Sequence, residues 1–181
     1  MPIPKAHVGL DSNCLTYLLT TISDITEPTD LLASEKIALI RIWFYKPGNF
    51  CFYLTETVVS EVKNIPDSKH RELHDSFIRT LFCDYPVQDV DKVLKRAAYF
   101  QNLHNKQNDC RVLAEAEELG LDILLTYDND FWKKLKCISN KTRLMKPSEY
   151  WASLGIPKGA TPITVPHSTN PLSQENWWRW K

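Results

Sequence analysis

The segment Ile123-Leu124-Leu125-Thr126-Tyr127-Asp128-Asn129-Asp130-Phe131 decides the fold. Its first four residues are apolar or β-branched, which is typical of a short strand covered on both faces. Two acids follow, Asp128 and Asp130, where the strand should give way to a helix. In open α/β sheets, ligands bind outside the carboxyl ends of the strands. A carboxylate in that place would stand on rigid backbone and face a crevice.

The same order of strand, acid and helix occurs near the start of the chain. Residues 7–10 predict a strand that ends at Asp11, and a helical pattern begins at Cys14, with Ser12 or Asn13 as its N-cap. Further helices are expected over residues 31–45, 69–81, 90–100 and 110–119 and after a Thr57 cap, and further strands over 50–54, 82–85 and 143–145. This alternation predicts an α/β fold with a mostly parallel sheet.

Length and composition set the broad class of protein. The 181 residues fit one domain with some extra chain, and no apolar run approaches the roughly 20 residues of a membrane span. The start of the chain lacks the apolar core of a signal peptide, so we expect a cytoplasmic protein. The five cysteines are widely spaced without a C-x-x-C pair, which favours reduced thiols over a zinc site or a disulfide framework. The formal net charge is zero, so a polyanion would be attracted only by local patches.

Five acids stand at the start of an expected helix or on a short helix beside a strand: Asp11, Glu61, Asp109, Asp128 and Asp130. Carboxylates brought together repel one another unless they are protonated or a cation neutralises them. Hard oxygen ligands select Mg²⁺ or Mn²⁺, and such a metal can activate water and neutralise a phosphoryl oxygen. Each acid also has an ordinary structural interpretation, as a helix N-cap or as a solvated helix residue.

Four segments resemble the motifs of PIN domains, in the correct order: HVGLDSN (7–13), ETVVSEV (56–62), NDCRVLAEAEELGLDILLTYDNDF (108–131) and MKPSEYW (145–151). The resemblance spans roughly residues 6–152. It implies a three-layer α/β/α sandwich and a metal-dependent nuclease that usually acts on RNA. We therefore expect a PIN-like nuclease domain over residues 1–154 and a proline-rich C-terminal tail over 155–181.

The resemblance also implies roles for single residues. Asp11, Asp109 and Asp128 would hold Mg²⁺ or Mn²⁺, and Glu61 and Asp130 would hold the metal or orient its water. The polar positions beside them are matched by Asn13 and Thr126. The implied reaction is in-line attack of a metal-activated water on an RNA phosphodiester, which leaves a 5′-phosphate and a 3′-hydroxyl. Many small members of the family are toxins of bacterial toxin–antitoxin pairs, so an antitoxin partner and a homodimer are further expectations.

Two other features bear on partners. A run of basic residues with no acid among them follows the segment 123–131: Lys133, Lys134, Lys136, Lys141, Arg143 and Lys146. This run either tracks a nucleic-acid backbone or forms a solvated face. The tail ends in a cluster of tryptophans at 177, 178 and 180. Such a cluster can stack on bases, but exposed tryptophan lowers solubility, so we expect it to dock on this domain or on a partner protein.

Two alternative functions remain open from the sequence. One is a non-catalytic interaction module that keeps the fold and binds a partner through its tail. The other is a metal-dependent phosphatase, because Asp11-Ser12-Asn13 is similar to the D-x-D that follows a strand in haloacid-dehalogenase phosphatases. Asn13 stands where that family has its second acid, which disfavours this reading.

Overall fold

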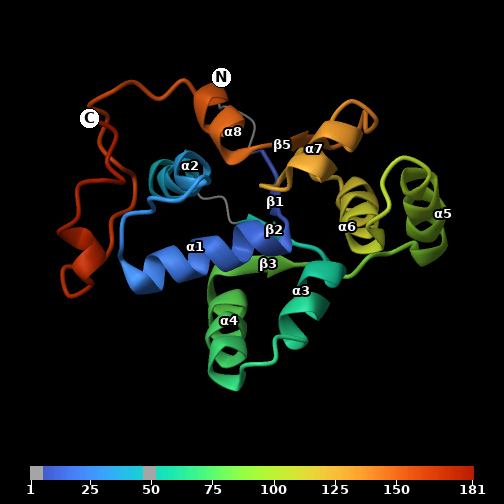
Figure 1. The fold of residues 1–181 in the computed structure, drawn as a ribbon, viewed down its shortest axis with the longest axis horizontal. Helices are drawn as coiled ribbons and strands as arrows, with labels where there is room; N and C mark the ends of the chain where they lie inside the picture. Colours follow the sequence, from blue (N-terminus) through green and yellow to red (C-terminus); the bar gives the residue numbers. More distant parts are fainter. Residues whose placement is uncertain (1–5, 47–51) are drawn as a thin grey trace.

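A five-stranded, all-parallel sheet organises the molecule, and helices cover both of its faces (Figure 1). The computed structural model describes residues 6–46 and 52–181. The strands are β1 (Val8–Leu10), β2 (Phe52–Leu54), β3 (Phe82–Asp84), β4 (Ile123–Leu125) and β5 (Arg143–Met145). Their order in the sheet is β3-β2-β1-β4-β5, so the expected α/β fold with a parallel sheet is confirmed.

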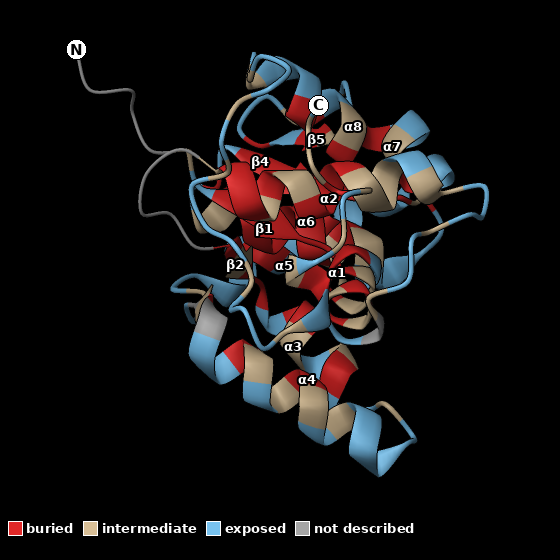
Figure 2. Cartoon of the chain, turned by 90° about the vertical axis from the view of Figure 1, so that its left-hand side faces the viewer, coloured by how far each residue is buried: buried red, intermediate tan, exposed pale blue. Residues whose placement is uncertain are grey.

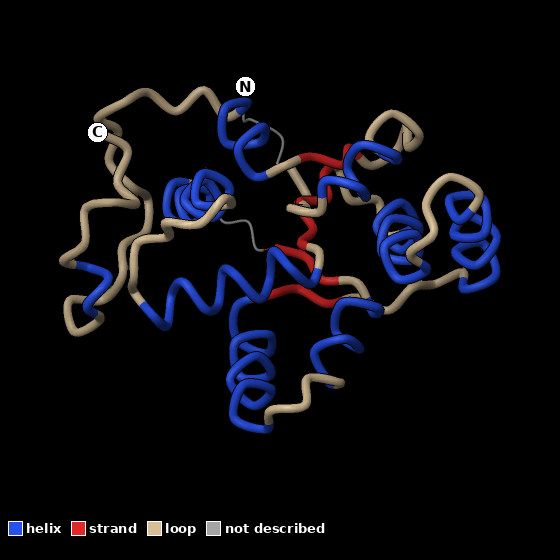
Figure 3. Tube along the Cα trace, viewed as in Figure 1, coloured by secondary structure: helices blue, strands red, loops and turns tan. Residues whose placement is uncertain are grey.

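The helices alternate with the strands along the chain. They are α1 (Ser12–Asp24), α2 (Ala33–Tyr45), α3 (Glu56–Lys63), α4 (Ser68–Leu81), α5 (Val90–Gln101), α6 (Gln107–Glu118), α7 (Asn129–Leu135) and α8 (Pro147–Ser153). Figure 1 and Figure 3 show α2 and α8 on one side of the sheet and α6 with α5 on the other. The part of the expected 50–54 strand before Phe52 lies outside the described residues.

The core lies where the two central strands meet these helices (Figure 2). Every residue of β1 and β4 is buried, as the unbroken apolar pattern of β4 predicts. Gly9 permits this packing, because a Cβ atom there would lie 2.8 Å from a methyl carbon of Leu121. Gly120 ends α6 with a φ of 68°, as a glycine after a helix commonly does.

Three helices that follow strands are capped by a residue near the strand end, which accepts a backbone N–H of the first turn. Asp11 caps α1, which is the ordinary structural role considered for this acid, while Ser12 and Asn13 lie inside the helix. Thr55 caps α3 instead of the expected Thr57, and Asp128 caps α7. The acids that follow β1 and β4 therefore both cap a helix, which fixes their side chains at the strand ends.

The C-terminal segment folds back onto α2 of the same chain. Trp178 is fully buried, with its ring 4.6 Å from that of Phe44, and its indole N–H donates to the carbonyl of Leu172 at 3.0 Å. The hydroxyl of Tyr45 accepts the backbone N–H of Trp180 at 2.9 Å. The tryptophan cluster thus docks on this domain, one of the two arrangements expected from the cost of exposing it.

The cysteines follow the sequence expectation in part. Cys14 and Cys110 are buried free thiols, and Cys137 is free but exposed. Cys83 is disulfide-bonded, so the expectation of a reduced thiol is wrong there. Cys51 lies outside the described residues. Linear spacing conceals such a bond, because a disulfide depends on Cα atoms that the fold brings close.

In the described part of the chain, no helix combines the length and the apolar character that crossing a membrane requires.

Candidate functional site

The candidate site lies at the carboxyl ends of the two central strands. Asp11 follows β1 and Asp128 follows β4, and these strands are hydrogen-bonded neighbours. The strand order reverses between them, because β2 and β3 extend one way from β1 while β4 and β5 extend the other. Such a switch point leaves a crevice outside the strand ends, which is the usual binding place in open α/β sheets.

Asp11 is a buried carboxylate at the centre of this edge. Its Oδ1 accepts the backbone N–H of Cys14 at 2.7 Å, and its Oδ2 accepts the hydroxyl of Thr126. Only 6% of the Asp11 surface is exposed. Burial, with a smaller contribution from the charge of Asp109, raises its pKa to about 6 in spite of these hydrogen bonds. Within the described residues, Asp11 is therefore a buried acid that forms no ion pair.

Asp109 reaches the same edge from the first turn of α6. Burial raises its pKa most, and the charge of Asp128 adds to the shift. The hydrogen bond from His104 acts in the opposite direction, with His104 Nε2 lying 2.7 Å from Asp109 Oδ2. Asp109 thus interacts electrostatically with both Asp11 and Asp128.

Asp128 has the most favourable surroundings of the three acids. Its Oδ1 accepts the backbone N–H groups of Asp130 at 2.8 Å and Phe131 at 3.0 Å, and its Oδ2 binds the ammonium of Lys106. Burial alone would raise the pKa of Asp128, but the bond from Lys106 and the two backbone N–H groups outweigh it and lower the pKa. The hydrogen bond to Asp128 raises the pKa of Lys106 in turn, and the charges of Asp128, Asp109 and Asp130 add to this rise.

The ring of His104 lies between two of the predicted site acids. It is buried and stacks on Phe131, with centroids 5.7 Å apart and planes at 15°. Its Nδ1 lies 3.4 Å from Asp130 Oδ2 and makes no hydrogen bond. The sequence reasoning missed both His104 and Lys106. The available signal was their position in the loop that leads directly into Asn108-Asp109.

The other predicted residues lie around this centre. Glu61 on α3 accepts a hydrogen bond from the amide of Asn108, the residue before Asp109. Asp130 is half exposed and pairs with Lys134 at 3.0 Å. Asn13 is exposed in the first turn of α1.

The carboxylates suit a hard divalent cation in chemical type. In the described ranges 6–46 and 52–181, however, no three His, Cys, Asp or Glu side chains form a group that could hold a metal ion. Each of the four acids instead contacts a different partner: Asp11 contacts Thr126, Asp109 contacts His104, Asp128 contacts Lys106 and Glu61 contacts Asn108.

The basic run divides into three parts. Lys133 and Lys134 belong to α7, and Lys136 caps its end with its ammonium 3.6 Å from the ring centroid of Trp132. Arg143 opens β5, and Lys141 precedes it, so these two lie toward the amino edge of the sheet. Lys146 follows β5, and its ammonium donates to the side-chain oxygen of Asn129, the residue between Asp128 and Asp130. The structure therefore brings the α7 lysines and Lys146 nearer to the acids than Lys141 and Arg143.

No protein-family model and no curated protein matches this chain. Among solved structures, the fold is similar to a chain in the crystal structure of VapBC2 from Rickettsia felis bound to a DNA fragment from its promoter. The TM-score is 0.48 and the sequence identity 11%, over 76% of this chain and 96% of that chain. The function proposed below therefore rests on the side chains at the strand edge.

Proposed function

We propose that this chain is a metal-dependent endoribonuclease whose site is the carboxyl edge of β1 and β4. The observation that carries the proposal is the buried Asp11 carboxylate beside Asp109, with a pKa raised to about 6. A fold that keeps acids close together in a buried setting must pay for their repulsion unless a cation relieves it. A divalent cation on hard oxygen ligands would do so.

In this proposal Mg²⁺ or Mn²⁺ is held by Asp11, Asp109 and Asp128, with Glu61 and Asp130 beside them. When bound, the ion would lower the pKa of a water molecule and would neutralise charge on a phosphate oxygen. Binding requires Asp128 to exchange its Lys106 partner, and the Lys106 ammonium is half exposed and free to move to solvent or to a phosphate.

The chain's own side chains orient the acids. Thr126 and the backbone N–H of Cys14 hold the two oxygens of Asp11. His104 Nε2 holds Asp109 Oδ2, and the Asn108 amide holds Glu61. Partners of this kind that orient ligating groups typically change metal affinity or activity 10- to 100-fold when they are removed, as a rough guide.

The test is cleavage of structured and unstructured RNA by the purified protein with Mn²⁺, with Mg²⁺ and with EDTA. Asp128→Asn should abolish a metal-dependent cleavage that leaves 5′-phosphates. Asp122→Asn is the matched control, because Asp122 precedes β4 while Asp128 follows it, and its carboxylate accepts the backbone N–H of His7 at 2.7 Å. Equal cleavage with EDTA, or by Asp128→Asn, would reject the proposal.

A non-catalytic interaction module is the second candidate. It is favoured by the Lys106–Asp128 ion pair and by the lack, within the described residues, of a three-residue metal group. Calorimetric titration with Mn²⁺ separates the two candidates. A nuclease should bind the ion and lose binding in Asp11→Asn, whereas a module of this kind should give no binding in either protein.

Regulation belongs to the same proposal. An antitoxin that holds the nuclease inactive, a homodimer and a cytoplasmic location are predictions from the family resemblance. Co-purification of a small partner encoded beside this chain, followed by light scattering of the complex, would test the first two.

A further inference from the structure

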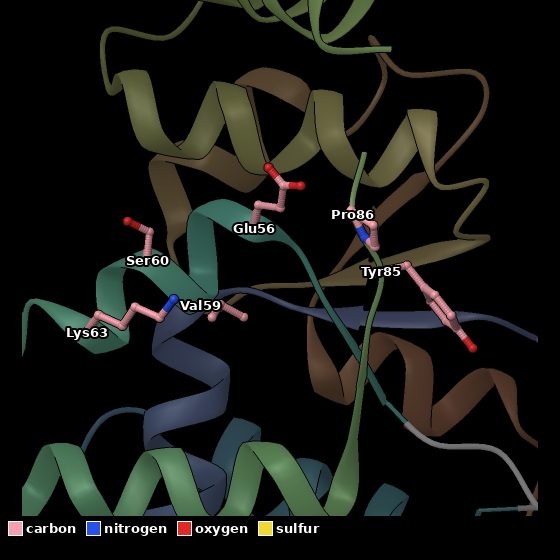
Figure 4. A pocket seen from close by; sticks show the side chains of 6 residues that line it. All are labelled: Glu56, Val59, Ser60, Lys63, Tyr85 and Pro86. Atoms are coloured by element: carbon pink, nitrogen blue, oxygen red, sulfur yellow. The ribbon is translucent and has the colours of Figure 1, made fainter. Parts of the chain in front are cut away.

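Two adjoining cavities flank α3, next to the candidate site. The first has a volume of about 370 Å³ and is lined by Glu56, Val59, Ser60, Lys63, Tyr85 and Pro86 (Figure 4). The second has a volume of about 380 Å³ and is lined by Glu56, Thr57, Ser60, Glu61, Asn64, Asn108 and Arg111. They share Glu56 and Ser60, so they form one depression, the α3 groove, which leads from Tyr85 to Glu61.

The outer end of the α3 groove carries an exposed aromatic ring. Tyr85 follows β3, and 55% of its surface is exposed. The ring of Tyr53 packs against it in a tilted arrangement, with centroids 5.8 Å apart and planes at 31°. A supported, exposed tyrosine offers a rigid platform on which a nucleobase can stack.

A carboxylate faces the same cavity. Glu56 Oε1 accepts the backbone N–H of Val87 at 3.0 Å, which fixes the side chain beside Tyr85. Within the described residues, Glu56 Oε2 accepts no hydrogen bond. A carboxylate oxygen in a base pocket accepts an exocyclic amino N–H, as it does from cytosine N4, and uracil offers no such group.

Two cations line the groove, Lys63 in the first cavity and Arg111 in the second. Lys63 has no carboxylate partner in the described part of the chain. Arg111 donates through Nε to Glu115 at 3.0 Å, and 42% of its side chain stays exposed. Cations along a groove attract the phosphates of a nucleic-acid strand.

We propose that the α3 groove is a nucleobase subsite for the RNA strand. Tyr85 stacks a base that carries an exocyclic amino group, Glu56 accepts the N–H of that group, and Lys63 and Arg111 bind the adjoining phosphates. The subsite rests on the proposed nuclease function, because it leads the strand past Glu61 to the acids at the strand edge.

The test measures binding of short fluorescent single-stranded RNA by anisotropy, in EDTA so that the RNA stays intact. Tyr85→Ala should weaken binding roughly tenfold, the loss expected from one stacked base, and Tyr85→Phe should retain it. Tyr99→Ala is the matched control, because Tyr99 is 50% exposed on α5 and lies outside the groove. Glu56→Gln should reduce the preference for oligocytidine over oligouridine by roughly fivefold or more.

The outcomes separate this inference from the proposed function. If Tyr85→Ala melts normally and binds RNA as tightly as the wild type, and the wild type cleaves RNA, the subsite is rejected and the nuclease stands. If the wild type neither binds nor cleaves RNA, both are rejected. Equal losses in Tyr85→Ala and Tyr99→Ala would also reject the subsite, because the effect would not belong to the groove.

Discussion

Two groups of carboxylates, one within α6 and one at the carboxyl edge of β1 and β4, have different partners. Glu117 on α6 receives a two-pronged bond from Arg96, at 2.6 and 2.9 Å, and a hydroxyl from Ser139 at 2.6 Å. Glu115, two residues earlier on α6, is 1% exposed and is held by the hydroxyl of Thr57 at 2.7 Å and by Arg111. These acids have permanent partners and tie helices together.

The acids at the strand edge have fewer partners than charges. Among the described residues, Asp109, Asp128 and Asp130 pair with His104, Lys106 and Lys134, Asp11 has no ion pair, and the pKa values of Asp11 and Asp109 are raised. Where a fold needs buried acids only for structure, it supplies guanidinium groups, as at Glu117. The acids that lack such partners are the better candidates for function.

The largest expected effect concerns catalysis at the strand edge. Asp109→Asn should slow RNA cleavage by about 10³-fold, equivalent to roughly 4 kcal/mol in the barrier, because a metal ligand is lost. Stability should hold, because the substitution removes an acid whose pKa burial raises. Single-turnover cleavage with Mn²⁺ measures the rate. Retention of more than a tenth of the wild-type rate would remove Asp109 from the site.

The next effect concerns the structural acids. Arg96→Met should lower the free energy of unfolding by about 3 kcal/mol, because it leaves the buried Glu117 without its guanidinium. Urea denaturation measures the change, and the double variant Arg96→Met/Glu117→Leu should recover part of it. Cleavage by the folded protein should be unchanged. A cleavage defect in this variant would show that the two groups of acids are coupled.

A smaller effect should depend on pH. The pKa of Asp11 in the folded protein is about 6, above its ordinary 3.8, so its ionisation destabilises the fold as pH rises through this interval. Asp11→Asn does not titrate. Its stability relative to the wild type should therefore increase by about 2 kcal/mol between pH 4 and pH 7. Urea denaturation at both pH values tests this, and a difference that does not vary with pH would contradict the raised pKa.

The smallest expected effect concerns Thr126. Thr126→Val removes the hydroxyl that donates to Asp11 and should lower stability at neutral pH by about 1–2 kcal/mol. It should also raise the pKa of Asp11 further, because this bond lowers it. Thr126→Ser keeps the hydroxyl and serves as the control. Equal stability of the valine and serine variants would show that the bond contributes little.

The sequence predicted what depends on local pattern. The unbroken apolar run of β4, the alternation of strands and helices, and the proximity of Asp11, Thr126 and Asp128 all follow from strand ends that meet at one edge. The cap of α3 is Thr55 rather than the expected Thr57, because several neighbouring polar residues can act as a cap and the pattern does not choose among them.

The parts that sequence reasoning missed depend on tertiary packing. His104 and Lys106 lie in a loop without periodicity; His104 contacts the nearby Asp109, and only the fold brings Lys106 to Asp128, 22 positions later. The disulfide at Cys83 likewise depends on distances that linear spacing does not reveal. The assignment of roles to the five acids stays a prediction for the experiments above.

The anchoring of Trp178 on α2 sets an order for events during protein synthesis. Arg41 on α2 donates to the carbonyl of Trp178, 137 positions later in the chain. At about 5–20 residues per second, a ribosome needs on the order of 10–30 s to add that much chain. The apolar surface of α2 around Phe44 therefore stays uncovered by Trp178 for that time, and the nascent chain is open to aggregation or chaperone binding there. The segment around Trp178 is the one that closes it.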